Sequence, residues 1–250
     1  MEIEKIGVID SGLGGLSLVK QMKEQELAIE CHYICDHINV PYGQKGQAFM
    51  LAHTRIMVNK LIKKDIKNIL IACNTLTAET IEDIRNEFKE ISFTGIEPFI
   101  NYLNHPLATG KERIGLILTQ ATYKSARFKF LLEKFDGQKQ IDICPLEYLA
   151  VYIENHFFEK RNHWNDIEDE LEFIKRKNWS HIILGCTHYP LITEYFENEF
   201  NLMVIDPHLQ VINQLVKTAR LQKGKFGNEI FFSSNLGEDW EKKNFSHLLS

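Results

Sequence analysis

Short apolar runs alternate with longer helical patterns along almost the whole chain, and this alternation restricts the fold more than any other feature of the sequence. Strands separated by helices indicate βαβ units. Runs that are apolar on both faces indicate a central parallel sheet covered by helices. The predicted fold class is therefore α/β. We expect strands at residues 5–10, 31–36, 68–73, 91–96, 113–118, 140–145, 181–186, 202–206 and 228–235, and helices at 16–24, about 45–64 and 77–90.

Two pairs of similar segments indicate that the chain consists of two related halves. "IGVIDSG" at 6–12 resembles "IGLILTQ" at 114–120, and "ILIACNT" at 69–75 resembles "IILGCTH" at 182–188. The first pair is offset by 108 residues (114 minus 6), and the cysteines of the second pair by 113 (186 minus 73). The predicted strand at 228–235 comes after both cysteine segments, so we expect the end of the chain to complete the first half. The expected domains are residues 1–97 plus 208–250, and residues 98–207.

Charge and hydropathy restrict the partners and the compartment. The net charge is −5 and there is no dense Lys/Arg stripe, which argues against a nucleic-acid partner. The start "MEIEKIGVID" lacks the basic region of a signal peptide, and no apolar run approaches the ~18 residues of a membrane span. We therefore expect a cytoplasmic protein with no membrane partner. In that reducing compartment the cysteines should be free thiols; they are Cys31, Cys35, Cys73, Cys144 and Cys186.

Polar residues follow several of the predicted strands at the point where each strand ends. In open α/β sheets, ligands bind outside the carboxyl ends of the strands. Any one of these residues has an ordinary explanation as a helix cap or as buried filler. Their gathering at one edge predicts a functional site. They are Asp10, Ser11, Asp36, Cys73, Asn74, Thr75, Thr119, Cys186, Thr187 and His188.

Cofactor and metal sites are less well supported by these residues. The loop "DSGLGGLS" (10–17) suits an anion at a helix N-terminus. However, Ser17 takes the last glycine position of the dinucleotide fingerprint, and Asp10 brings a negative charge to the loop entrance. Cys186 and His188 have no further metal ligands nearby in the sequence. A hydrolase built on that pair would leave Cys73 without a role. We therefore expect no cofactor and no metal.

Two thiols, one from each half, suit a reaction at a stereocentre. To invert a Cα–H centre, a base removes the proton from one face and an acid returns a proton to the other face. Two related halves that close over a substrate can offer one group each. A free cysteine has a pKa of ~8.5, so a modest decrease gives a thiolate at neutral pH, and a neighbouring helix N-terminus supplies such a decrease.

Five motifs, spread in order over nearly the whole chain, resemble those of the glutamate racemases in the cofactor-independent aspartate/glutamate racemase superfamily. They are "DSGLGG" (10–15), "PYG" (41–43), "ACNT" (72–75), "TQAT" (119–122) and "GCTHYP" (185–190). His188 after the second Cys-Thr pair favours the glutamate branch over the aspartate branch. The resemblance implies two similar α/β domains related by a pseudo-twofold axis, an active site in the cleft between them, and no pyridoxal phosphate or metal.

The resemblance also implies roles for individual residues. Cys73 and Cys186 correspond to the two catalytic acid/bases, with Asp10 and His188 as their helpers, and Glu154 corresponds to an assisting glutamate. The implied substrate-binding positions are Asp10, Ser11, Tyr42, Gly43, Asn74, Thr75, Thr119, Thr187 and His188.

The expected activity is the interconversion of L- and D-glutamate, which supplies D-glutamate for peptidoglycan. The partner would be this small-molecule substrate, and the expected assembly is a homodimer. Two alternatives stay open. One is racemisation of another amino acid such as aspartate, and the other is a non-catalytic paralogue that binds glutamate or regulates.

Overall fold

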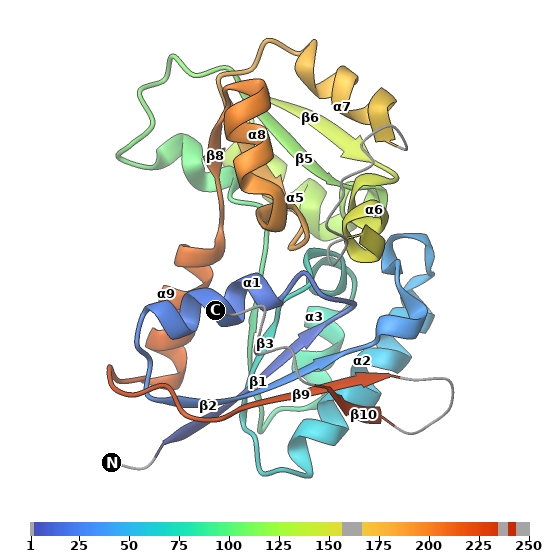
Figure 1. Ribbon diagram of the computed structural model, residues 1–250, viewed down its shortest axis with the longest axis vertical. Coiled ribbons are helices and arrows are strands. Elements are labelled where there is room, and N and C mark those ends of the chain that lie inside the picture. The colour runs from blue at the N-terminus through green and yellow to red at the C-terminus, as the bar shows by residue number, and fades with distance from the viewer. Residues whose placement is uncertain (1–2, 157–166, 235–239, 244–250) are drawn as a thin grey trace.

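Two sheets made mainly of parallel strands organise the protein, and they lie one above the other in Figure 1. The structure, a computed structural model, describes residues 3–156, 167–234 and 240–243. The first sheet contains β1 (Glu4–Asp10), β2 (Ile29–Cys35), β3 (Asn68–Ile71), β4 (Ser92–Gly95), β9 (Glu229–Ser234) and β10 (Trp240–Lys243). The second sheet contains β5 (Ile114–Thr119), β6 (Ile141–Leu146), β7 (His181–Gly185) and β8 (Met203–Ile205).

Helices connect the strands and cover both sheets. The α-helices are α1 (Leu16–Glu24), α2 (Gln47–Ile62), α3 (Asn74–Glu87), α4 (Gln120–Lys124), α5 (Ala126–Phe135), α6 (Leu149–His156), α7 (Glu168–Lys175), α8 (Thr193–Phe200) and α9 (His208–Ala219). Short 3-10 helices, η1 (His37–Asn39), η2 (Tyr42–Gln44), η3 (Ile100–Asn104) and η5 (Tyr189–Ile192), lie in the connections. In the parts of the chain that are described, no helix is long and apolar enough to cross a membrane.

The two sheets repeat one strand order. Four strands of the first sheet run in the order β2-β1-β3-β4, and the second sheet runs β6-β5-β7-β8. Neighbouring strands within each of these series are parallel. The α/β class predicted from the alternation of strands and helices is thereby confirmed. Cys73 follows β3 and Cys186 follows β7, so the two thiols leave equivalent strands of the repeated order.

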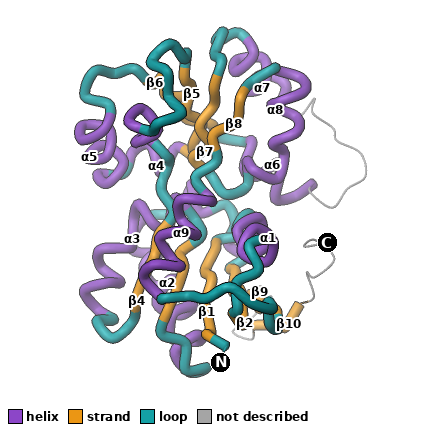
Figure 2. Tube along the Cα trace, turned by 90° about the vertical axis from the view of Figure 1, so that its left-hand side faces the viewer, coloured by secondary structure: helices purple, strands orange, loops and turns teal. Residues whose placement is uncertain are grey.

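Apolar side chains on both faces of the first sheet explain why helices cover it twice. Ile6 and Val8 of β1 pack with α1 and α9 in one core cluster, whereas Ile9 packs with α2 and α3 in another. Figure 2 shows α1 and α9 close together on one side of that sheet. The second sheet has the same arrangement, with α6, α7 and α8 on one face and α5 on the other.

The end of the chain returns to the first sheet. After β8, helix α9 packs against α1. Strand β9 then pairs in parallel with β2, from Cys31 opposite Glu229 to Cys35 opposite Ser233. Strand β10 pairs antiparallel with β9. Parts of the expected domain ranges, namely residues 1–2, 157–166, 235–239 and 244–250, lie outside the described residues.

The predicted helix at 77–90 begins three residues earlier than expected. This shift places Cys73 at the start of the helix. Helix α3 starts at Asn74, and Cys73 is its N-cap residue with an extended backbone (φ −98°, ψ 121°). No α-helix starts directly after Cys186, because a turn and the 3-10 helix η5 come before α8. The two similar sequence segments therefore continue into different local structures.

Candidate active site

Cys73 lies at the N-terminus of α3, beside the loop that follows β1. Its thiol is 6% exposed. The Sγ atom lies 3.4 Å from the Ser11 hydroxyl oxygen. Burial, followed by the charge of Asp10, raises the pKa of the Cys73 thiol to about 12, although the Ser11 hydroxyl and the Leu76 N–H act to lower it. At neutral pH this thiol therefore carries its proton, and the pKa decrease expected from a neighbouring helix N-terminus is wrong for Cys73, because burial outweighs it.

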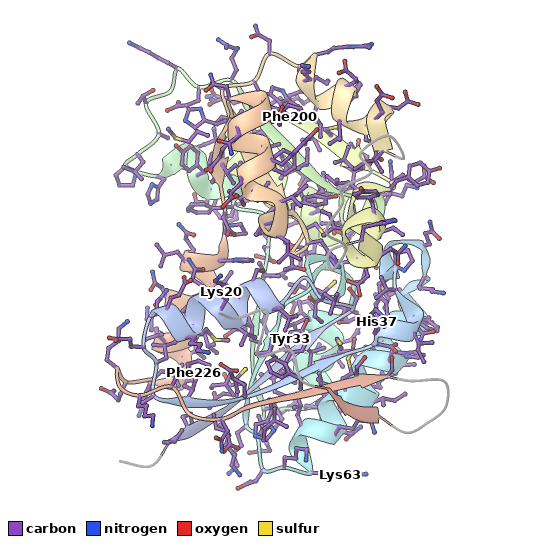
Figure 3. All side chains as sticks on the ribbon, in the orientation of Figure 1. Lys20, Tyr33, His37, Lys63, Phe200 and Phe226 are labelled. Carbon is purple, nitrogen blue, oxygen red and sulfur yellow. The ribbon has the colours of Figure 1, made fainter. Side chains whose placement is uncertain are left out.

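Asp10 ends β1 and is completely buried. The backbone N–H groups of Ser11, at 2.7 Å, and of Gly15 donate to its two carboxylate oxygens. The hydroxyl of Tyr33, a residue labelled in Figure 3, donates to the same carboxylate at 3.4 Å. Burial raises the pKa of Asp10, whereas the charge of His188 and the two backbone N–H groups lower it. The Asp10 carboxyl group can therefore accept a proton from the Cys73 thiol or return one to it.

Cys186 and His188 form the counterpart in the second half. The Cys186 thiol is 7% exposed, and its Sγ atom lies 3.7 Å from His188 Nδ1. The other ring nitrogen of His188, Nε2, lies 2.6 Å from Glu154 Oε2. Burial acts to lower the pKa of His188, but the hydrogen bonds to Cys186 and Glu154 raise it well above its usual value. An imidazolium therefore lies beside this thiol.

Glu154, from α6, is the residue through which the two halves meet. Its carboxylate is buried and accepts the Leu13 N–H at 2.8 Å. It also lies 2.8 Å from His37 Nδ1, which belongs to the first half. Burial alone would raise the pKa of Glu154, but the hydrogen bonds from His188 and His37 lower it to about 2. The glutamate suggested by the motif resemblance is thus a permanent anion that holds His188.

The glycine-rich loop after β1 fits closely against the second half. A Cβ atom on Gly12 would lie 2.4 Å from Glu154 Oε2. A Cβ atom on Gly14 would lie 2.6 Å from Thr187 Oγ1 and 2.8 Å from the His188 backbone nitrogen. Such distances are shorter than real Cβ contacts, so only glycine permits this approach. The glycines that suggested an anion-binding loop here serve to bring the two halves together.

Asn74 supplies an unoccupied pair of hydrogen-bonding atoms next to Cys73. Its side chain is buried, and within the described chain neither Oδ1 nor Nδ2 has a hydrogen-bond partner. A buried polar group without a partner costs roughly 1–3 kcal/mol. A polar ligand that reached this amide would recover that free energy.

Three threonines, Thr75, Thr119 and Thr122, form a contact between the two halves. Thr75 Oγ1 lies 2.9 Å from Thr119 Oγ1 and 3.2 Å from Thr122 Oγ1. Thr119 caps α4 by accepting the Thr122 N–H, and the two hydroxyls lie 3.0 Å apart. Thr122 was not among the predicted site residues, although the motif "TQAT" contains it. Its position three residues after a helix-capping threonine was the available signal.

A third buried carboxylate, that of Asp36, organises the "PYG" segment. The Tyr42 hydroxyl donates to Asp36 Oδ2 at 2.5 Å, and His53 Nδ1 lies 2.7 Å from the same oxygen. Burial and the Asp36 charge raise the pKa of Tyr42 well above its usual range. This network holds the backbone of Gly43 near Thr119, since a Cβ on Gly43 would lie 3.8 Å from Thr119 Cβ.

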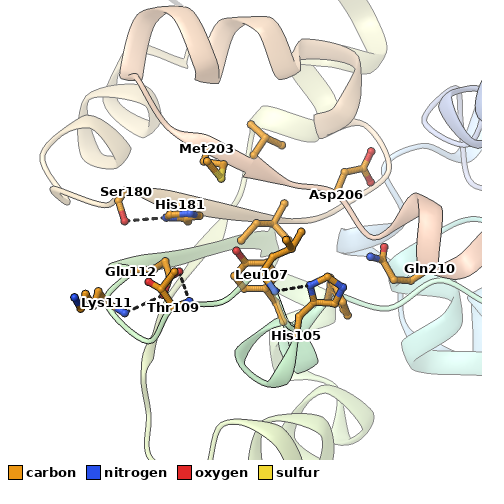
Figure 4. A pocket seen from close by; sticks show the side chains of 14 residues that line it. His105, Leu107, Thr109, Lys111, Glu112, Ser180, His181, Met203, Asp206 and Gln210 are labelled. Atoms are coloured by element: carbon orange, nitrogen blue, oxygen red, sulfur yellow. Dashed lines mark hydrogen bonds between the residues drawn. The ribbon is translucent and has the colours of Figure 1, made fainter.

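A pocket elsewhere in the second half contains none of the predicted site residues. It has a volume of about 750 Å³ and lies between η3, with the loop after it, and β8 (Figure 4). Apolar side chains such as Tyr102, Leu107 and Met203 line it, together with His105 and Asp206. No cysteine lines this pocket, so we place the candidate site at the thiols instead. In the described residues, no group of three or more His, Cys, Asp or Glu side chains could hold a metal ion.

The structure brings most of the predicted residues into two linked groups. One contains Asp10, Ser11, Cys73, Asn74, Thr75 and Thr119, and the other contains Cys186, Thr187 and His188 with Glu154. Besides Thr122, sequence reasoning missed His37. It follows β2 directly after Asp36, at the same edge of the sheet, and that position was the only available signal.

Comparisons with known proteins match this chain over nearly all of its length. A family profile described as Asp/Glu/Hydantoin racemase matches residues 6–215. The glutamate racemase of Clostridium novyi (strain NT) is 32% identical over 249 residues, which cover 96% of this chain and 95% of that protein. Glutamate racemase 2 of Bacillus subtilis (strain 168) is 31% identical over 235 residues, covering 92% and 88%.

Solved structures share the fold. Escherichia coli glutamate racemase, in complex with L-glutamate and the activator UDP-MurNAc-ala, has a TM-score of 0.80 at 22% identity and covers 95% of this chain and 91% of that one. Glutamate racemase from Francisella tularensis subsp. tularensis SCHU S4, in complex with D-glutamate, has a TM-score of 0.74 at 26% identity, covering 95% and 90%. The fold and these matches define an isomerase class, the racemases built from two α/β halves. More narrowly, the chain belongs to the Asp/Glu/hydantoin racemase family, which confirms the resemblance found in the motifs.

Proposed function

We propose that this protein is a glutamate racemase that inverts Cα by transferring protons through Cys73 and Cys186. The observation that carries the proposal is the pair of nearly buried thiols at equivalent strand ends, each beside its own proton-exchanging group. Cys73 has Asp10 close by, and Cys186 has His188. The names of the similar proteins support glutamate as the substrate.

Each thiol would act on one face of the substrate. In one direction Cys73 removes the Cα proton while Cys186 returns a proton to the opposite face, and in the other direction the roles exchange. When Cys73 acts as base, it must first lose its own proton, and Asp10 is the nearby carboxyl group that can accept a proton. When Cys186 acts as acid, the adjacent imidazolium of His188 can resupply its proton. The burial of both cysteines strengthens these interactions, because it excludes water.

The remaining predicted residues would bind the polar groups of the substrate. The unpaired amide of Asn74 is the strongest candidate, because both of its polar atoms are buried without partners in the described chain. The hydroxyls of Ser11, Thr75, Thr119 and Thr187 and the segment Tyr42–Gly43 would supply further hydrogen bonds to the substrate. The proposed protein uses no cofactor and no metal, because two thiols can perform the proton transfers unaided.

We further propose that the domain boundaries follow the two sheets. The first domain would comprise residues 1–97 and 208–250, and the second residues 98–207. The parallel pairing of β9 with β2 supports this division. A homodimer, a cytoplasmic location and the supply of D-glutamate for peptidoglycan complete the proposal.

A racemisation assay without added cofactor tests the proposed function directly. Purified protein is incubated separately with the L enantiomers of a panel of amino acids, including glutamate and aspartate, and the products are separated by chiral chromatography. We expect D-glutamate to form fastest and activity to survive treatment with EDTA. Faster conversion of aspartate would change the substrate. Binding of glutamate without any conversion would favour a regulatory paralogue.

A further inference from the structure

Tyr33 contacts both the helper of the first thiol and the loop that packs against the second half. It belongs to β2, and its side chain is completely buried in the first half (Figure 3). Its hydroxyl donates to the Gly12 carbonyl oxygen and lies 3.4 Å from Asp10 Oδ2. Because the hydroxyl carries a single proton, it can donate fully to only one of these two acceptors at a time.

Packing holds the Tyr33 ring and the Gly12 acceptor in place. A Cβ atom on Gly15 would lie 3.1 Å from Tyr33 Cε2, and the ring packs against Phe231 of β9 with centroids 6.0 Å apart. Gly12 is close to the second half, since a Cβ there would lie 2.4 Å from Glu154 Oε2. Rotation about the Cζ–Oη bond can therefore turn the hydroxyl proton from one acceptor to the other without displacing the ring.

The Tyr33 hydroxyl differs from the backbone donors to Asp10 because it can turn away. The N–H groups of Ser11 and Gly15 have fixed directions, so they point at the carboxyl group whether it is charged or neutral. A hydrogen bond to a charged acceptor is roughly twice as strong as one to a neutral acceptor. The Tyr33 hydroxyl should therefore favour Asp10 when that group is ionised, and the Gly12 carbonyl when Asp10 holds a proton.

Tyr33 keeps its own proton and acts neither as an acid nor as a base. Burial, followed by the charge of Asp10, raises the pKa of its phenol group well above the usual value. In the described part of the chain, its hydrogen bonds go to Asp10 and Gly12 and to neither thiol of the candidate site. Any influence on the reaction therefore passes through these two partners.

We propose that Tyr33 is a positioning residue that stabilises the ionised form of Asp10 and so prepares it to take the proton of Cys73. The inference rests on the proposed two-thiol racemisation, because in that reaction Asp10 accepts this proton when Cys73 acts as the base.

The proton transfer balances. The Ser11 hydroxyl lies 3.4 Å from both Cys73 Sγ and Asp10 Oδ1, so it can receive the thiol proton while it gives its own proton to Asp10. The thiol becomes a thiolate, the carboxylate becomes a neutral carboxyl group, and the Tyr33 proton turns to the Gly12 carbonyl. Between turnovers the free enzyme exchanges protons with water, Asp10 is ionised again, and the Tyr33 hydroxyl turns back.

The test compares Tyr33→Phe, which removes only the hydroxyl, with Asp10→Asn and with the double variant. Steady-state racemisation by the full-length protein is measured from L- and from D-glutamate. Because the two enantiomers are equally stable, kcat/KM is the same in both directions for every variant, so kcat is compared one direction at a time. Tyr102→Phe is the matched control, because Tyr102 is also buried but lines the separate pocket of Figure 4.

We expect Tyr33→Phe to lower kcat by about 10-fold in the direction in which Cys73 is the base, and by less than about 3-fold in the other, since one hydrogen bond to a charged group is lost. The more strongly affected direction should be the same as for Asp10→Asn. In the Asp10→Asn background, Tyr33→Phe should leave the ratio of the two kcat values unchanged, because no charge remains for the hydroxyl to stabilise. Tyr102→Phe should behave like the wild type.

Three results would overturn this role of Tyr33. They are wild-type kcat values for Tyr33→Phe, an equal loss in both directions, and the same change of the kcat ratio with and without the Asp10 charge. If Tyr33→Phe fails to fold by circular dichroism, 3-fluorotyrosine at position 33 decides, because it keeps the ring and makes the hydroxyl a stronger donor. A changed kcat ratio then supports the role, and an unchanged ratio rejects it. An active wild type with an unaffected Tyr33→Phe rejects only this inference, whereas an inactive wild type rejects the proposed function.

Discussion

Cys73 and Cys186 leave equivalent strands of the same strand order, yet their surroundings differ in structure and in charge. Cys73 caps a 14-residue helix and lies beside Ser11. Cys186 precedes a turn and a short 3-10 helix and lies beside His188. The repeated topology therefore explains why a thiol follows the equivalent strand in each half. It does not determine their protonation, which depends on neighbours that the two halves do not share.

The charges next to the two thiols have opposite signs. On the first side, burial and the charge of Asp10 keep Cys73 protonated. On the second side, His188 is held as an imidazolium between Cys186 and the Glu154 carboxylate. A two-base reaction needs one protonated and one unprotonated group at any moment. The two thiols therefore lie in opposite electrostatic settings.

The two thiols also differ in which half of the protein contributes the groups around them. Apart from Cys186, the groups that act on Cys73 belong to the first half; they are Ser11, Asp10 and the Leu76 N–H. Those around Cys186 end in Glu154, whose carboxylate is held by Leu13 and His37 of the first half. Opening the cleft would therefore change the environment of Cys186 more than that of Cys73.

The largest expected effect comes from removing either thiol. Cys73→Ala and Cys186→Ala should each reduce racemisation in both directions by ~10²–10⁴-fold or more, because every direction needs one acid and one base. Cys144→Ala is the matched control, since Cys144 is also a buried thiol, and it should keep activity close to the wild type. The measurement is kcat/KM from L- and from D-glutamate. Near-normal activity of either site variant would remove that cysteine from the mechanism.

Removing Asp10 or His188 should slow the two directions of racemisation unequally. Asp10→Asn and His188→Asn should each cost about 10–10³-fold, less than loss of a thiol, because a helper tunes a thiol without touching Cα. The loss in kcat should be larger in one direction than in the other, and the favoured direction should be opposite for the two variants. Kinetics from both enantiomers provide the measurement. Equal losses in both directions for both variants would contradict a separate helper for each thiol.

The pH dependence of stability should have opposite signs on the two sides. The pKa of Glu154 falls from 4.5 to about 2, so its contribution is present above pH 4.5 and is lost as the pH falls through about 2. That change corresponds to about 3 kcal/mol. The pKa of Asp10 is raised above 3.8, so its favourable contribution is present below that pH and is lost as the pH rises.

At neutral pH, Glu154→Gln should therefore lower the free energy of unfolding, and Asp10→Asn should raise it. Chemical denaturation across the acid range is the appropriate measurement. The acid-side loss of stability should be smaller in Glu154→Gln than in the wild type. A decrease of similar size in both variants at neutral pH would show that the two carboxyl groups are not in opposite electrostatic settings.

A smaller effect is expected from Gly14→Ala, which disturbs the contact between the halves without removing a reacting group. The added Cβ would meet Thr187 and the His188 backbone, and overpacking of this kind costs about 1–3 kcal/mol. Activity should fall by about 10-fold or more if that cost weakens the closed state. Gly46→Ala is the control, because a Cβ there meets nothing within 4 Å. Equal activity of the two variants would show that the close approach at Gly14 is unimportant.

The sequence predicted much of this arrangement because strand periodicity and strand-end chemistry are local signals. The positions of β1 to β9 could be read from it, as could the location of Asp10, Cys73, Cys186 and His188 after strand ends, but β10 was not predicted. The hydrogen bond between Glu154 and Leu13 could not, since it joins residues 141 apart. Periodicity also gives no information on why Cys73 caps a helix while Cys186 does not. Those differences arise from tertiary packing, which single-sequence patterns do not describe.

The most direct test of the two-thiol account is the position of deuterium during racemisation in D₂O. Pure L-glutamate and pure D-glutamate are incubated separately, and substrate and product are isolated at low conversion and analysed by mass spectrometry. If the two thiols work on opposite faces, deuterium appears at Cα of the product first, and the recovered substrate carries little. Deuterium in the recovered substrate equal to that in the product, from either enantiomer, would indicate a single base and would contradict the account.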